Sequence, residues 1–245
     1  IILGIVAAVL INFFTVSKKD YAAALDQYNT VSSANYTLQS KLSSLQYGVD
    51  SSTDTSFSND MDAAKSASAD VSKKADALSK LKAVSLGEGA TKYKAFATKM
   101  DAYLVYVNNQ LTSFESMREA AVTCNDTGSS SSSISAIKSS IDDCVTALDK
   151  VSDVPDADVK EFIGKVKDEY TSLSGVMGKL AAITDPYGSQ YDQYKSLRDQ
   201  MYAISDKISE AQTDFRSNLE KHSDAVDPKS TADDLSKYLE SKAYN

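Results

Sequence analysis

Few side chains in this chain could act as nucleophiles, bases or metal ligands. It has two cysteines, Cys124 and Cys144, and one histidine, His222. An even pair of cysteines predicts one disulfide in an oxidising compartment, and the alternative is two unrelated buried thiols. No metal site is expected, because no Cys or His spacing supplies four ligands.

The sequence also lacks a recognisable catalytic arrangement. His222 follows Phe215 and Leu219 at helical spacing, which predicts a structural histidine rather than a general base. No serine or cysteine has a base at a known spacing, and neither HExxH nor a glycine-rich phosphate loop occurs. We therefore expect no enzymatic activity and no cofactor.

Acidic residues cluster at 50–62 and 153–158. Both clusters lack the central glycine and terminal glutamate of an EF-hand loop, so we expect solvated helix caps and keep weak calcium binding as the alternative. The net charge of −8 and the pI near 4.7 argue against nucleic acid as a partner.

Two sequons could accept a glycan, at Asn35 and Asn125. Asn35 falls on an apolar helical stripe, which favours a chance match or a polar break in packing. Asn125 lies beside Cys124 in the serine-rich loop and is the candidate for glycosylation.

The first sixteen residues, Ile1–Val16, carry no charge. As a helix they cover about 24 Å, against a hydrocarbon core of roughly 30 Å, so they would span a bilayer only with thinning or snorkelling by Lys18 and Lys19. No small-residue cleavage site follows, which disfavours a signal peptide. The segment is either a membrane anchor or packs among copies of itself.

Self-packing is indicated by Gly4 and Ala8, a small-xxx-small pair that lets helices approach closely. The absence of an initial methionine predicts that an upstream leader has been removed or lies outside the given sequence. Lys18 and Lys19 alone would prefer the cytoplasmic side. The residues expected to make the assembly contacts are Ile1, Ile2, Leu3, Gly4, Ile5, Val6, Ala8, Val9, Ile11, Phe13 and Phe14.

The apolar segment is expected to continue into the first helix of the soluble part. No proline or glycine occurs between Gly4 and Gly48, which predicts one helix about 70 Å long. Its later half carries apolar residues three and four positions apart, with one gap at Asn35. They are Tyr21, Leu25, Tyr28, Val31, Leu38, Leu42, Leu45 and Val49.

This arrangement resembles the type IV pilins, over the first fifth of the chain. In that family a processed N-terminal hydrophobic helix continues into a globular head and packs with its copies along a filament axis. The family's usual aromatic first residue, early glutamate and helix-kinking proline are replaced by Ile1, Ile5 and Ala22. The contact that the glutamate makes between subunits is therefore not implied for this chain.

The remaining sequence predicts an all-α fold, a long N-terminal hydrophobic helix continuing into an antiparallel helical-bundle head. Prolines and glycines are few, and no window alternates as a strand would. Residues 1–18 form the anchor or assembly segment, and residues 19–245 an extracellular head of one elongated bundle or two stacked ones. Apolar stripes predict helices at 54–85, 90–123, 133–152, 156–184, 187–226 and 230–243.

Tyrosines such as Tyr28, Tyr93 and Tyr191 lie on these stripes and are expected in the core. Gly164, Gly175 and Gly178 fall inside one predicted helix, where close helix packing is the first interpretation and a hinge the alternative.

Two function classes follow. The first is a cell-surface filament subunit that polymerises with itself, resides in the membrane before assembly, and serves attachment or motility. The second is a single-pass anchored sensory or binding ectodomain, similar in outline to chemoreceptor ligand domains. Those receptors carry a second hydrophobic segment, and none follows Tyr244 and Asn245, which favours the first class. A secreted bundle toxin or surface coat protein is a third option.

Overall fold

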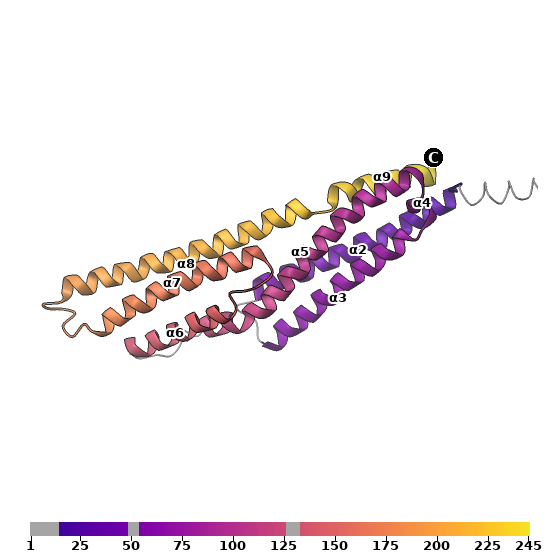
Figure 1. Cartoon of the computed structure of the whole chain (residues 1–245). Helices are drawn as coiled ribbons and strands as arrows, with labels where there is room; N and C mark the ends of the chain where they lie inside the picture. The colour runs from indigo at the N-terminus through magenta and orange to yellow at the C-terminus, as the bar shows by residue number, and fades with distance from the viewer. Residues whose placement is uncertain (1–14, 49–53, 126–132) are drawn as a thin grey trace, which may run out of the picture. The chain divides into compact units, whose positions relative to one another are not determined.

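The computed structural model describes residues 15–48, 54–125 and 133–245. These residues form α-helices and short connections, with no strand among them, so the predicted all-α class is confirmed (Figure 1). The helices are α2 (Lys18–Gly48), α3 (Asp54–Ser79), α4 (Lys82–Ser85), α5 (Gly87–Asn125), α6 (Ile134–Lys150), α7 (Ala157–Ala181), α8 (Tyr191–Val226) and α9 (Lys229–Tyr244).

The helices gather into two compact units. Unit 1 takes in α2 as far as Leu45, Ser58–Asn108 and Ser223–Asn245, and unit 2 takes in Gln46–Phe57 and Asn109–His222. Helices α5 and α8 thus contribute residues to both units. How the units are arranged within the head stays a prediction.

The core of unit 1 begins with the apolar face of α2. Six residues of the predicted stripe are buried, namely Leu25, Tyr28, Val31, Leu38, Leu42 and Leu45. Tyr21 is half-buried, and Val49 lies outside the described residues. The spacing of three and four therefore identified the buried face correctly.

Three helices close over that face of α2. The ring of Tyr28 meets the edge of Phe96 in α5, with centroids 6.0 Å apart. Gln27 donates through Nε2 to a backbone carbonyl of α3 at 3.0 Å. Tyr21 packs edge-on against Tyr238 of α9 at 5.8 Å. Unit 1 is therefore a helical bundle, as the stripes predicted.

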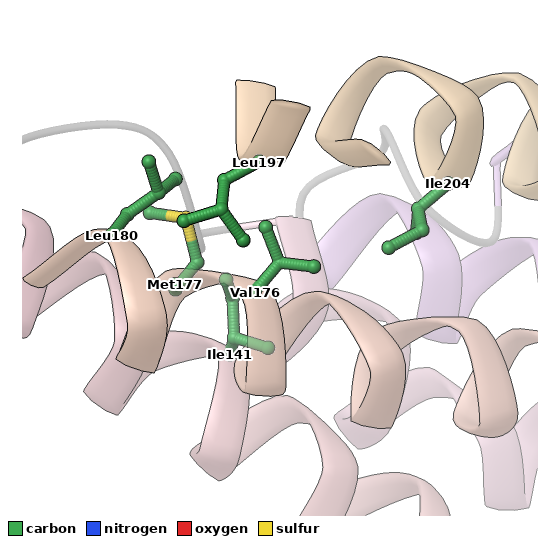
Figure 2. Close-up of a cluster of buried hydrophobic side chains, with 6 residues drawn as sticks. All are labelled: Ile141, Val176, Met177, Leu180, Leu197 and Ile204. Carbon is green, nitrogen blue, oxygen red and sulfur yellow. The ribbon is translucent and has the colours of Figure 1, made fainter. Parts of the chain in front are cut away.

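Unit 2 is built mainly from α6, α7 and α8. Figure 1 shows α7 and α8 lying alongside each other, joined by the turn at 182–190. A buried cluster links the three helices, with side chains directed toward one another in Figure 2. Its members are Ile141 of α6, Val176, Met177 and Leu180 of α7, and Leu197 and Ile204 of α8. Farther along, Phe162 of α7 stacks on Phe215 of α8 with centroids 4.6 Å apart.

The predicted helix at 54–85 is interrupted at Lys80 and Leu81, so α3 ends at Ser79 and α4 is a separate turn. The interruption buries Val84 in the core. It also brings the start of α5 close to α4, since a Cβ at Gly89 would lie 1.8 Å from the carbonyl oxygen of Ala83. Only glycine fits that approach.

The glycines inside α7 do not mark close packing throughout. A Cβ at Gly164 or Gly175 would meet no atom within 4 Å, so the first interpretation is wrong at both positions. At Gly178 a Cβ would lie 3.4 Å from the Lys138 side chain, which is a contact between α7 and α6. The helix is unbroken from Ala157 to Ala181.

The predicted continuous helix from Gly4 to Gly48 is confirmed from Lys18 to Gly48 and is wrong at the three described residues before it. Thr15, Val16 and Ser17 are not helical, and α2 begins at Lys18. The earlier residues of that prediction, up to Phe14, lie outside the described residues. Among the helices that the structure describes, none is long and apolar enough to cross a membrane.

Proline at Ala34 should strongly destabilise unit 1. Ala34 is buried in the middle of α2, so proline there would remove a helical hydrogen bond, clash with the preceding turn and cost about 3 kcal/mol or more. The free energy of unfolding by denaturant, followed by circular dichroism, measures the loss. Lys18→Pro is the matched control, because the first helical position tolerates proline. Equal stability of Ala34→Pro and the wild type would contradict the continuity of α2.

Candidate assembly and contact sites

A reciprocal cap sets the start of α2. The Ser17 hydroxyl accepts a bond from the Asp20 amide at 3.3 Å and donates to the Asp20 carboxylate at 2.8 Å. The Ser17 amide donates to the same carboxylate at 2.8 Å. This is a capping box with aspartate in the third helical position. The Ser-x-x-Asp spacing is a sequence signal that the apolar run before it obscured.

Electrostatics reinforce the cap. The hydrogen bonds from Ser17 lower the pKa of Asp20 below its ordinary value, and the nearby charge of Lys82 acts in the same direction. Lys82 also donates to the carbonyl oxygen of Thr15 at 2.5 Å. The junction between the apolar segment and unit 1 is thus fixed by polar bonds at Thr15, Ser17 and Asp20.

The residues expected to make assembly contacts, Ile1 through Phe14, lie outside the described residues. The buried hydrophobic side chains of the described part begin at Ala24.

The predicted disulfide is confirmed. Cys124, in the last turn of α5, is bonded to Cys144 of α6, and their Cα atoms are 4.6 Å apart. Cys144 is fully buried, so the bond belongs to the core of unit 2. The α6 helix begins next to the enclosed loop, where the Ser133 hydroxyl accepts a bond from the Ala136 amide at 3.2 Å.

The two sequon asparagines differ in their surroundings. Asn125 is the last residue of α5 and is exposed, so its glycosylation remains a prediction. Asn35 is half-buried, and its Oδ1 atom is shielded from solvent without a hydrogen-bond partner. That environment supports the interpretation of Asn35 as a polar break in the stripe.

His222 is paired with a carboxylate. Its Nδ1 lies 2.6 Å from Oδ2 of Asp158, whose side chain is 6% exposed, whereas the histidine is 58% exposed. The pair joins the end of α8 to the first turn of α7 within unit 2. This contact gives the histidine a hydrogen-bonded structural position.

The acidic cluster at 153–158 is only partly solvated. Asp153 is exposed and pairs with Lys160 at 2.9 Å. Asp156 caps α7 by accepting a bond from the Val159 amide at 3.0 Å, yet it is buried, and burial raises its pKa. The expectation of solvated caps is therefore wrong at Asp156 and Asp158. Among the residues that the structure describes, no group of three or more His, Cys, Asp or Glu side chains could hold a metal ion.

An open groove of about 350 Å³ runs between α7 and α8. Val176 and Ile204 contribute apolar walls, and Lys207 forms an ion pair with Glu169 at 3.4 Å. Gly175 widens the groove because it has no side chain. The rest of the lining is polar or small, with Ser172, Lys179, Gln200 and Ala203.

Two tyrosines around the start of α8 are exposed, which the helical spacing did not predict. Tyr191, expected in the core, is 50% exposed, and Tyr187 in the preceding turn is 87% exposed. Tyr28 is buried as expected. The turn sequence Asp-Pro-Tyr-Gly-Ser from Asp185 was the available signal, because proline and glycine there end the helical pattern and set Tyr187 apart from it.

Comparison with known proteins adds no relative. No protein-family model, curated protein or solved structure matches the chain. Its functional interpretation therefore rests on its own residues.

Removing the cap should weaken α2. Ser17→Ala should lower the free energy of unfolding by about 1 kcal/mol, whereas Ser43→Ala, at an exposed mid-helix site, should leave it almost unchanged. Because the pKa of folded Asp20 is lowered, its contribution is complete above the ordinary aspartate pKa of about 3.9 and is lost as pH falls through the folded value.

Denaturant unfolding at a series of pH values tests this linkage. The stability advantage of the wild type over Asp20→Asn should be constant near neutrality and shrink below about pH 4. A constant difference down to the acid transition would show that the carboxylate is not part of the cap.

The cross-link should stabilise unit 2. The non-reduced chain should be two hydrogens lighter than the reduced one by mass spectrometry. Cys124→Ser should lower the free energy of unfolding by about 3 kcal/mol, and Cys144→Ser by at least as much, since either change opens the same loop and Cys144 is also buried. Free thiols in native protein taken from the cell surface would contradict this assignment.

Proposed function

We propose that the chain is a structural subunit of a pilus-like filament, with its N-terminal apolar segments packed in a common core and its acidic helical heads displayed outside. The observation that carries this proposal is the sixteen-residue uncharged segment Ile1–Val16 ahead of a helical head. Among the residues from Thr15 on that the structure describes, the buried hydrophobic side chains begin at Ala24. An uncharged apolar segment gains stability from burial, and we propose that copies of the same segment, or a membrane before assembly, provide it.

The cap at Ser17 and Asp20 supports separate roles for the apolar segment and for α2. It satisfies the amides of Ser17 and Asp20, so the head helix can start without an upstream helical turn. The apolar segment can then adopt the conformation that packing in the filament needs, while α2 packs in the core of unit 1.

The disulfide supports an extracytoplasmic head, because such bonds form and persist in oxidising compartments. We propose that the subunit is held in the membrane before it joins the filament. The acidic head keeps neighbouring heads soluble and is a poor partner for nucleic acid.

A second candidate is a single-pass anchored sensory or binding ectodomain. The groove between α7 and α8 favours it, because Lys179, Gln200 and Lys207 face the space left by Gly175. A Cβ added at Gly175 would meet no atom within 4 Å, so Gly175→Val would place a side chain in the groove, and Gly164→Val is the matched control outside it. A ligand response lost only in Gly175→Val would support this class.

Deletion of residues 1–16 tests the filament. The remaining chain retains Ser17 and the cap, so it should be a soluble monomer by light scattering. The full chain should form fibres in negative-stain micrographs. Gly4→Leu should reduce fibre formation by blocking close helix approach, whereas Ile2→Leu, which conserves volume, should not.

The opposite results would separate the two candidates. Polymerisation of the truncated chain would show that the segment is not the assembly element. Detergent-dependent monomers or dimers of the full chain, without fibres, would favour the anchored ectodomain.

A further inference from the structure

The turn between α7 and α8 displays aromatic rings. Tyr187 is 87% exposed, and Tyr191 at the start of α8 is 50% exposed. The ring of Tyr187 lies 6.5 Å from that of Tyr194, centroid to centroid. Three tyrosines therefore gather within eight residues at one end of the α7–α8 hairpin.

Hydrogen bonds fix the backbone that carries Tyr187. The Gln190 side chain accepts bonds from the amides of Thr184 and Asp185 at 2.8 and 2.9 Å. The Asp185 carboxylate accepts a bond from the Ser189 amide at 2.8 Å. A Cβ at Gly188 would lie 2.3 Å from that carboxylate, so the bonded turn requires glycine there. Binding through Tyr187 would need little ordering of the chain.

We propose that this turn binds neutral carbohydrate, with Tyr187 and Tyr191 stacking on hexose rings. The inference rests on the proposed function, to which it adds an attachment target. A hexose has C–H-rich faces bordered by hydroxyl groups. The C–H faces are attracted to the negative face of an aromatic ring, and the hydroxyls need donors and acceptors.

The surroundings of the two tyrosines match that chemistry. Between residues 184 and 195 the exposed side chains other than tyrosine all carry hydrogen-bonding groups, and none is aliphatic. They are Thr184, Asp185, Ser189, Asp192, Gln193 and Lys195.

The negative charge of the turn favours uncharged carbohydrates over acidic ones. Over residues 184–195 two aspartates, Asp185 and Asp192, outnumber the one lysine, Lys195. The whole chain carries a net charge of −8. Acidic polysaccharides and anionic lipid surfaces would be repelled, so the turn suits uncharged sugars. Weak single sites suffice, because a filament presents many copies of the turn.

Chemical-shift titration of the full chain with ¹³C-labelled tyrosine rings tests the proposal. The probes are maltohexaose, cellohexaose and chitohexaose, and the detergent must lack a sugar headgroup. At least one probe should shift the Tyr187 and Tyr191 signals. Tyr187→Ala should weaken its binding roughly tenfold, and Tyr187→Phe should retain it because the ring makes the contact.

Tyr36→Ala is the matched control, because Tyr36 is 76% exposed but belongs to unit 1. Gly188→Val should weaken binding while the circular dichroism spectrum stays unchanged, since it disrupts only the turn. Failure of all three sugars to bind, or an equal loss in Tyr36→Ala, would overturn the proposal. So would self-association of the chain that Tyr187→Ala abolishes, because the turn would then be a protein contact.

Micrographs of the same preparation keep the two proposals separate. Fibres that bind none of the sugars would overturn the carbohydrate site and leave the filament intact. Sugar binding without fibres would overturn the filament and leave the carbohydrate site intact.

Discussion

Unit 1 depends on the burial of one face of α2. The opposite face, from Asn29 to Ser44, exposes serine, threonine, asparagine, glutamine and one tyrosine, and none of its exposed residues is charged. Several hydroxyls there bond to carbonyls of their own helix, as Thr37 does with Ser33 at 3.1 Å. Serine and threonine are poor helix formers, so α2 owes its stability to the packing of its apolar stripe. The capping box at Ser17 then determines where that packed helix starts.

In unit 2 a covalent bond complements the side-chain core. The apolar cluster around Val176 joins α6, α7 and α8, while the cross-link at Cys144 ties α6 to the end of α5. The buried carboxylates of Asp156 and Asp158 occupy the first turn of α7, one as its cap and the other as the partner of His222. Their polar atoms are satisfied by an amide and an imidazole, which lets them be buried. The turn beyond Ala181 is held in the same way, by side chains that bond to its backbone.

Periodicity predicted most helices and the buried face of α2. Apolar residues spaced three and four positions apart lie on one side of a helix, and that side is the one that packs against its neighbours. The pair of cysteines predicted the disulfide for a similar reason, since nothing else in the chain competes for them. The start of α2 at Lys18 was not predicted, because apolar residues continue upstream of Ser17. Periodicity alone cannot detect a helix cap. Tyr191 lies on a stripe at the start of α8, where half of its side chain stays exposed. The burial of Asp158 depends on His222, sixty-four residues away, which no local pattern reveals.

The cross-link also determines how the chain would respond to force. Cys124 and Cys144 are twenty positions apart, so tension applied along the backbone passes through the sulfur atoms and bypasses the residues between them. That segment corresponds to roughly 65 Å of extended chain that stretching cannot release while the bond is intact. In the proposed filament, a head under tension would therefore extend less in an oxidising medium than in a reducing one.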